Sequence, residues 1–222
     1  MNQWAYAILF TVGFIGFLFF VEWIHRYYIT KVEYTRKLAH SFACLSSMLF
    51  VLFFESTLFV VLMGILFFLI LFIGKHYHLF NSIDKIERKS IGSFLLPISI
   101  GTMFYISRTL DSDLLFILPI LVLGISDPLA GISGSLSKSK LSKIILFNNT
   151  LEKTYFGSGL FFISALLLSA IVLFVYSFSI VEVATISLLI AAVSTAVELL
   201  SIRGIDNITI PLSIASILYL CQ

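Results

Sequence analysis

The sequence predicts an all-α fold, a single polytopic bundle of transmembrane helices, and the first reason is its composition. Of its 222 residues, 59% are hydrophobic and only 12% are charged, whereas a soluble domain carries roughly 25% charged residues. The mean hydropathy is +1.08. Apolar runs recur along the whole chain, and no stretch is polar enough to form a separate soluble domain. We therefore expect one integral membrane domain over residues 1–222.

Eight apolar segments divide the chain, and each is expected to form a helix. They lie near residues 4–24, 38–54, 57–74, 91–107, 114–134, 157–178, 183–201 and 208–221. The first seven approach the roughly 20 residues that a bilayer core requires. At about 1.5 Å per residue the last reaches only ~21 Å, so it either thins the bilayer or stops short of one face. The first segment lacks the features of a cleaved signal peptide, and we expect it to be retained.

Basic residues predict the orientation. With eight spans, 13 of the 14 Lys and Arg residues fall in loops on one side, and only Arg108 falls on the other. By the positive-inside rule the basic side faces the cytosol and both termini lie on the opposite side. No basic tract interleaved with aromatic residues is present, so a nucleic-acid partner is not expected.

The second segment opens with RKLAH, residues 36–40. Arg36 and His40 are four residues apart and share one helical face, with Lys37 beside them. A positive face at the cytosolic end suits an anionic substrate. The alternative is an ordinary basic helix end. Arg88, Lys89 and Ser90 repeat the pattern before the fourth segment, and there the ordinary helix end is preferred.

The fifth segment ends in SDPLAGISG, residues 126–134. A carboxylate within a membrane helix is costly and usually lines a polar cavity, which makes Asp127 the first candidate. Pro128 disfavours helical geometry at Asp127, so we expect a broken helix here. Gly131 and Gly134 allow close approach of a ligand. They could equally form a small-residue face for helix packing.

The sixth segment is preceded by LEKTYFGSG, residues 151–159. The ammonium group of Lys153, the hydroxyls of Thr154 and Ser158 and the free N–H groups of a helix start near Gly157 together predict a phosphate-binding site. The alternative is that these residues only cap the helix.

The last two segments are joined by ELLSIRGIDNITIP, residues 198–211. Glu198 lies in an apolar run, and Asp206 and Asn207 follow a turn at Gly204. Mg²⁺ usually takes one or two carboxylates together with phosphate oxygens and water, so these oxygen-rich residues are candidate ligands. Asn207 could instead cap the last helix.

Other sites are not indicated. Cys44 and Cys221 lack the spacing of a metal site or a disulfide framework, and both are expected to be packing residues. His76 and His78 are interpreted as surface residues. Motifs such as HExxH, CxxC and the Walker-type phosphate loop are absent from the sequence.

Taken in order, RK-xx-H, S-D-P-x-A-G-x-x-G, K-T-x-x-G-S and E-(x)5-G-x-D-N-(x)3-P resemble the CTP-dependent lipid-alcohol kinase family, which includes phytol, polyprenol and dolichol kinases and CTP-dependent diacylglycerol kinase. The resemblance implies transfer of the γ-phosphate of CTP to a lipid hydroxyl with Mg²⁺. It implies three sets of residues: catalytic Asp127, Lys153 and Glu198; metal-binding Asp127, Glu198 and Asp206; and nucleotide-binding Arg36, Lys37, His40, Gly131, Gly134, Thr154, Gly157, Ser158 and Asn207.

Two rival functions share some of these features. A phosphatidate cytidylyltransferase also uses CTP and also has an Asp followed by spaced glycines, but its C-terminal signature is missing from this sequence. A small-molecule transporter would also contain intramembrane carboxylates, but it should show two related halves. We find no such internal symmetry.

Overall fold

The computed structural model describes residues 2–28, 31–84, 91–136, 143–146 and 149–221. Within these ranges the regular secondary structure is helical apart from one short hairpin. The helices are α1 (Gln3–Tyr27), α2 (Val32–Ser47), α3 (Phe50–Phe53), α4 (Thr57–His76), α5 (Asn81–Asp84), α6 (Gly92–Thr109), α7 (Leu114–Leu136), α8 (Tyr155–Val175), α9 (Ile180–Leu200) and α10 (Asp206–Cys221). The prediction of an all-α fold is confirmed at this level.

Each of the eight predicted segments contains a helix. Six helical stretches of the described chain are long and apolar enough to cross a bilayer: α1, α2 with α3, α4, α7, α8 and α9. α6 does not meet the same standard, and α10, with 16 residues, is the shorter apolar helix that the sequence predicted. Eight full crossings of the membrane would therefore require α6 and α10 to span it as well, and that part of the prediction is untested.

Local capping explains where several helices begin. The side chain of Asn2 accepts from the backbone N–H of Trp4 at the start of α1, and that of Ser56 accepts from Leu58 at the start of α4. α9 begins with a capping box in which Ser179 and Glu182 bond to each other's backbone N–H groups. These side chains satisfy amide groups that a bilayer cannot hydrate.

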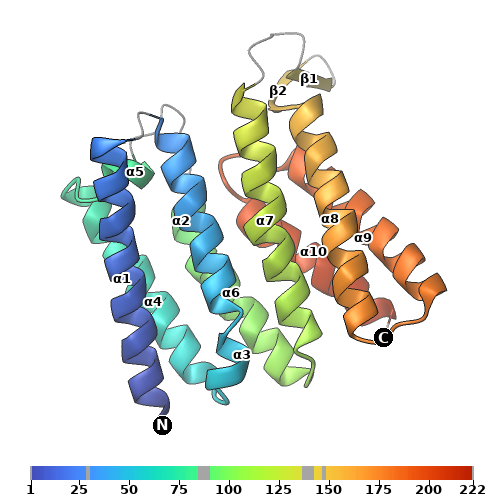
Figure 1. Ribbon diagram of the computed structural model, residues 1–222, viewed down its shortest axis with the longest axis horizontal. Helices are drawn as coiled ribbons and strands as arrows, with labels where there is room; N and C mark the ends of the chain where they lie inside the picture. Colours follow the sequence, from blue (N-terminus) through green and yellow to red (C-terminus); the bar gives the residue numbers. More distant parts are fainter. Residues whose placement is uncertain (1, 29–30, 85–90, 137–142, 147–148, 222) are drawn as a thin grey trace.

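α7 lies at the centre of the bundle, between α2 and α8 (Figure 1). In the 18-residue apolar stretch of α7, 67% of the residues are buried inside the protein, compared with 17% in the corresponding stretch of α1. Leu115, Phe116 and Leu123 of α7 are fully enclosed in the main apolar cluster. Because α7 is so largely enclosed by other helices, its polar residues Ser126, Asp127 and Ser133 are buried within protein.

The expected break at Pro128 is wrong. α7 runs without interruption from Leu114 to Leu136 and contains both Pro119 and Pro128. Pro128 removes the amide donor that would bond the carbonyl of Gly124. α7 nevertheless continues, because it is packed against α2 on one side and α8 on the other. His40 Nε2 of α2 lies 3.2 Å from the Leu123 carbonyl oxygen, one residue before Gly124.

Two other expectations are corrected. A short antiparallel hairpin, β1 (Lys143–Leu146) and β2 (Asn149–Thr154), precedes α8 where only a loop was expected. Cys44 is buried as predicted, but Cys221 is exposed at the end of α10. Figure 1 shows the hairpin at one end of the bundle and both chain termini toward the other.

Candidate active site

A polar cavity of about 200 Å³ opens at the hairpin end of the bundle, between α2, α7, α8, α9 and α10. Twelve of the thirteen predicted site residues line it: Arg36, Lys37, Asp127, Gly131, Gly134, Lys153, Thr154, Gly157, Ser158, Glu198, Asp206 and Asn207. His40 does not. The structure thus brings together four polar clusters that lie far apart in the sequence.

Asp127 forms a buried ion pair across α7 and α2. Its Oδ2 atom accepts from Lys37 Nζ at 2.6 Å, and the side chains are only 5% and 6% exposed, respectively. Gly131 leaves room for this pair, since a Cβ at that position would lie 2.5 Å from Lys37 Cε and the lysine side chain would have to shift. Gly131 was predicted to contact nucleotide, and in the structure it gives space to the side chain of Lys37, which passes over α7 at this position.

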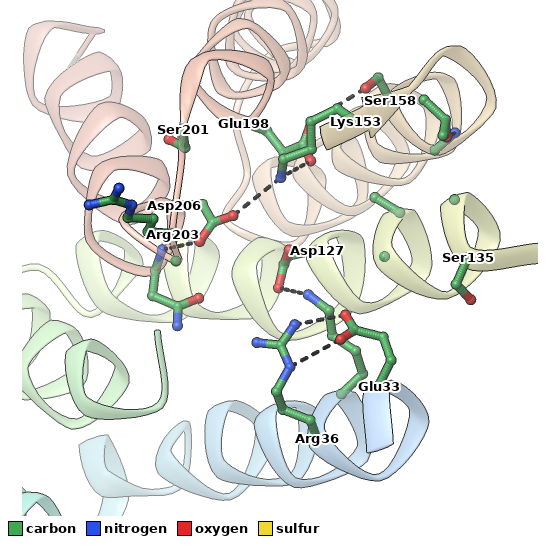
Figure 2. Close-up of a pocket in the computed structure, with 18 residues that line it drawn as sticks. Glu33, Arg36, Asp127, Ser135, Lys153, Ser158, Glu198, Ser201, Arg203 and Asp206 are labelled. Carbon is green, nitrogen blue, oxygen red and sulfur yellow. Dashed lines mark hydrogen bonds and ion pairs between the residues drawn. The ribbon is translucent and has the colours of Figure 1, made fainter. Parts of the chain in front are cut away.

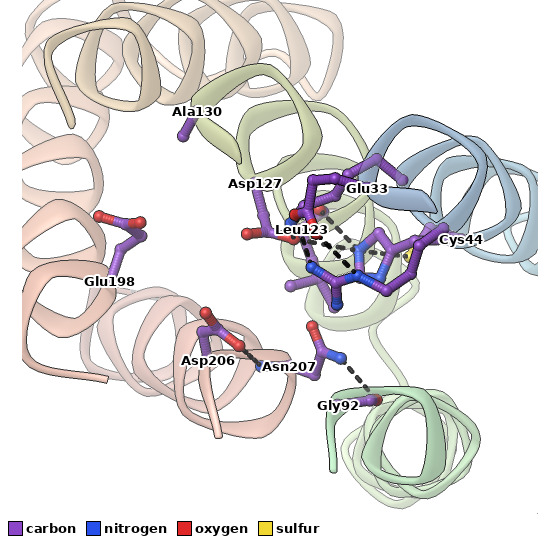
Figure 3. A network of polar contacts seen from close by, with 12 residues as sticks. Glu33, Cys44, Gly92, Leu123, Asp127, Ala130, Glu198, Asp206 and Asn207 are labelled. Atoms are coloured by element: carbon purple, nitrogen blue, oxygen red, sulfur yellow. Dashed lines mark hydrogen bonds and ion pairs between the residues drawn. The ribbon is translucent and has the colours of Figure 1, made fainter. Parts of the chain in front are cut away.

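His40 lies behind Asp127 instead of in the cavity. Its Nε2 atom is 3.7 Å from Asp127 Oδ2 and 3.8 Å from the sulfur of Cys44. Figure 3 shows Cys44 on the α2 side of Asp127, while the Asp127 carboxylate also faces the space between Glu198 and Asp206. His40 is therefore placed to orient Asp127, and its predicted contact with nucleotide is not what the geometry indicates.

Arg36 is paired with a residue that sequence reasoning missed. Its Nη2 atom donates to Glu33 Oε1 at 2.7 Å, and its Nε atom donates to Oε2 at 3.3 Å. Both residues line the cavity. The three-residue spacing of opposite charges on one helix was the signal that could have identified Glu33.

Lys153 joins the two acidic residues on the opposite wall. Its Nζ atom donates to Glu198 Oε1 at 2.5 Å and to Asp206 Oδ2 at 3.2 Å (Figure 2). Burial alone lowers the pKa of the Lys153 ammonium group, but the charges of Asp206 and Glu198 outweigh burial and raise that pKa above its ordinary value. Lys153 is therefore charged at neutral pH.

Thr154 and Gly157 have structural roles that the capping alternative described. Thr154 is the N-cap of α8, and its Oγ1 atom accepts from the backbone N–H of Gly157 at 3.1 Å. A Cβ on Gly157 would lie 2.8 Å from the carbonyl oxygen of Ala130, so glycine allows α8 to approach α7 closely. Ser158 is also buried, and its hydroxyl donates to Glu198 Oε2 at 3.4 Å.

The α9–α10 turn lines the cavity and is attached to α6. Arg203 and Gly204 have φ angles of 55° and 90°, and both line the cavity. The Ile91 amide donates to the Arg203 carbonyl at 2.9 Å. Asn207 is the second residue of α10 and not its cap, and its Nδ2 atom donates to the Gly92 carbonyl at 2.7 Å (Figure 3).

The remaining lining residues were not predicted as site residues: Glu33, Ala130, Ser135, Ser201, Arg203 and Gly204. Of these, the left-handed pair at 203–204 could have been suspected from the Arg-Gly turn that joins two polar clusters. Arg88, Lys89 and Ser90, which also drew notice in the sequence, lie outside the described residues.

The donor set is compatible with Mg²⁺ but is not a preformed cage. Within the described ranges, no group of three or more His, Cys, Asp and Glu side chains is arranged to hold a metal ion. Glu198 and Asp206 nevertheless converge on a single cationic atom, Lys153 Nζ. Two converging carboxylates are what Mg²⁺ uses when phosphate oxygens and water complete its shell.

Comparisons with known proteins give no relative on which to base an assignment. A scan against protein-family models, a search of curated proteins and a search of solved structures each found no match to this chain. The proposed function therefore rests on the residues of the chain and on the geometry of its cavity.

Proposed function

We propose that this protein is an integral membrane lipid kinase that transfers the γ-phosphate of CTP, with Mg²⁺, to the hydroxyl of a lipid alcohol such as phytol, a polyprenol, dolichol or diacylglycerol. One observation carries the proposal. Polar clusters from α2, α7, β2 with α8, and α9 with α10 meet around one cavity in an otherwise apolar bundle. Charged residues inside a membrane protein are expensive, and their convergence indicates a reaction or a transport site.

The charges of the cavity suit phosphoryl transfer. Arg36, Lys37 and Lys153 supply three cations, and Asp127, Glu198 and Asp206 supply carboxylates on the facing walls. Transfer of a phosphoryl group depends mainly on positioning and on neutralising the charge of the phosphate oxygens. Basic groups would therefore bind the triphosphate, and Glu198 and Asp206 would provide oxygen ligands for a metal that neutralises it further.

Asp127 is the group placed to orient the attacking hydroxyl. It lies on the central helix, its carboxylate lines the cavity, and it is bonded to Lys37 and lies 3.7 Å from His40 Nε2. In the proposed reaction the lipid oxygen forms a bond to the γ-phosphorus while the bond from that phosphorus to the bridging oxygen breaks. CDP leaves, and the hydroxyl proton passes to Asp127.

The position of the cavity fits two reactants of opposite polarity. It opens at the end of the bundle where the sequence places the basic loops, which the positive-inside rule assigns to the cytosol. CTP would reach it from water. A hydroxyl at the membrane interface would reach it from the adjacent leaflet, which explains why a kinase of this kind is built from membrane helices.

Labelled nucleotide tests the proposal directly. Purified protein is incubated with γ-labelled CTP or ATP, Mg²⁺ and phytol, a polyprenol, dolichol or diacylglycerol. We expect a labelled lipid monophosphate and CDP. A CDP-lipid with release of pyrophosphate would instead identify a cytidylyltransferase. No nucleotide-dependent product, together with counterflow uptake of a solute in proteoliposomes, would identify a transporter.

A further inference from the structure

Lys153 occupies a place between two carboxylates that a metal ion would otherwise take. Its ammonium nitrogen is bonded to both Glu198 and Asp206. The Glu198 side chain is only 2% exposed and that of Asp206 14% exposed, so water screens neither charge well. Two carboxylates at such a site repel each other and resist desolvation unless a cation lies between them. In the structure that cation is Lys153.

The two other buried cations of the cavity are also paired. Lys37 is bonded to Asp127, and Arg36 is bonded to Glu33. A phosphate group that binds one of these three cations draws it away from a carboxylate, which leaves that carboxylate without its partner. A metal ion that enters must displace a cation from a carboxylate, which leaves that cation without its partner. Phosphate binding thus frees a carboxylate for the metal ion, and metal binding frees a cation for the phosphate.

Lysine is well suited to exchange partners in this way. Its ammonium group is a compact charge on a flexible four-carbon chain with three rotatable donors, and it binds phosphate as readily as carboxylate. Lys153 lies in β2, immediately before the helix start at Thr154. A modest rotation of its side chain can move the charge within the cavity while the backbone of α8 stays in place.

We propose that Lys153 is an internal counterion: it holds Glu198 and Asp206 in the empty cavity and passes to a phosphate group when a divalent metal takes its place between them. Metal and phosphate then bind cooperatively, and neither binds well alone. The coupling is reciprocal, as any linkage between two binding sites must be. The nature of the phosphate compound rests on the proposed function, but the exchange itself does not.

Metal binding without nucleotide tests the exchange. Mn²⁺ is the probe, and its binding to detergent-purified protein is followed by electron paramagnetic resonance. We expect Lys153→Gln to bind Mn²⁺ about tenfold more tightly than wild type, because the carboxylates have lost their internal cation. Lys153→Arg keeps the positive charge and should stay weak. Arg26→Gln, which removes a cation from an ion pair with Glu22 outside the cavity, is the matched control and should not change binding.

Equal or weaker Mn²⁺ binding by folded Lys153→Gln would overturn the inference. A second measurement needs no variant: wild-type protein is compared at matched free Mn²⁺ with and without inorganic pyrophosphate. We expect pyrophosphate to raise protein-bound Mn²⁺ several-fold, and no increase would equally overturn the exchange. Because neither arm measures transfer, a protein that passes both and yet forms no phosphorylated lipid retains Lys153 as a counterion and loses only the kinase assignment.

Discussion

Asp127 shows how much the environment of one residue decides. A lone carboxylate in an apolar segment raises the free energy of inserting that segment into a membrane. Here the carboxylate is bonded to Lys37, lies near His40 and lines a cavity. Those contacts keep it oriented while its carboxylate stays accessible to a ligand. The sequence identified Asp127 because a charged residue in a membrane helix is energetically unfavourable, and the structure adds the residues that contact it.

We predict that Asp127→Asn reduces phosphoryl transfer by about 10²–10⁴-fold, because an amide can neither accept the hydroxyl proton nor carry negative charge. The measurement is turnover of labelled CTP with the preferred lipid, together with the thermal unfolding temperature. Asp113→Asn is the matched control, since Asp113 is paired with Arg108 away from the cavity. Near-normal turnover by Asp127→Asn would falsify the catalytic role.

The Lys37–Asp127 pair also predicts a stability effect. Lys37→Met leaves the Asp127 charge buried without its partner, and breaking a buried pair in this way costs about 3–5 kcal/mol of stability. The double variant Lys37→Met/Asp127→Leu removes both charges and should recover most of that loss. Thermal unfolding in detergent compares the two. If Lys37→Met is as stable as wild type, Lys37 does not compensate for the burial of the Asp127 charge.

At the scale of elements, the contact between α7 and α8 sets the width of the cavity. Gly157 permits this contact, because its missing Cβ would meet the Ala130 carbonyl at 2.8 Å and Thr154 Oγ1 at 3.0 Å. The carbonyl belongs to a helix backbone and cannot move aside easily. Small residues at such positions are a general device for bringing membrane helices together.

Gly157→Ala should therefore destabilise the protein by about 1–3 kcal/mol, the usual cost of overpacking. Gly159→Ala is the matched control on the same helix, because nothing lies within 4 Å of the position that its methyl group would take, and no loss is expected. Unfolding temperatures of the two variants give the comparison. If both variants behave alike, the α7–α8 contact is looser than the structure indicates.

The elements themselves were largely predictable. Each predicted segment contains a helix because apolar length is a local property of the chain. The continuous path of α7 through Pro128 was not predictable, because it depends on packing against α2 and α8, which a local sequence pattern does not contain. The hairpin before α8 was missed for a similar reason, since a short strand pair depends on its partner strand and carries only a weak local signal.

For the whole molecule, the main asymmetry is between the two ends of the bundle. The cavity and its charged residues lie at the hairpin end, and both termini lie toward the other. The positive-inside rule predicts that the cavity end faces the cytosol. Such an arrangement would give a cytosolic nucleotide access and keep the apolar remainder in lipid.

Two positions at opposite ends of α4 test this orientation. In a Cys221→Ser background only the buried Cys44 remains, so a new cysteine reports its own side. We expect a membrane-impermeant maleimide to label Glu55→Cys in intact cells, and Lys75→Cys only after permeabilisation. Both positions are exposed in the structure. The opposite pattern would place the cavity outside the cytosol.

The sequence by itself determined the helical membrane class, the approximate limits of the helices and the identity of most polar residues that line the cavity. These are local properties, since hydropathy, charge and spacing act within a few turns of the chain. Only the tertiary structure decided which charge meets which: Lys37 with Asp127, and Lys153 with Glu198 and Asp206. The tertiary structure also showed that His40 lies beside Asp127 and outside the cavity lining, and that Thr154 caps α8. Such pairings join residues 45 to 90 positions apart, and they depend on how whole helices pack against one another.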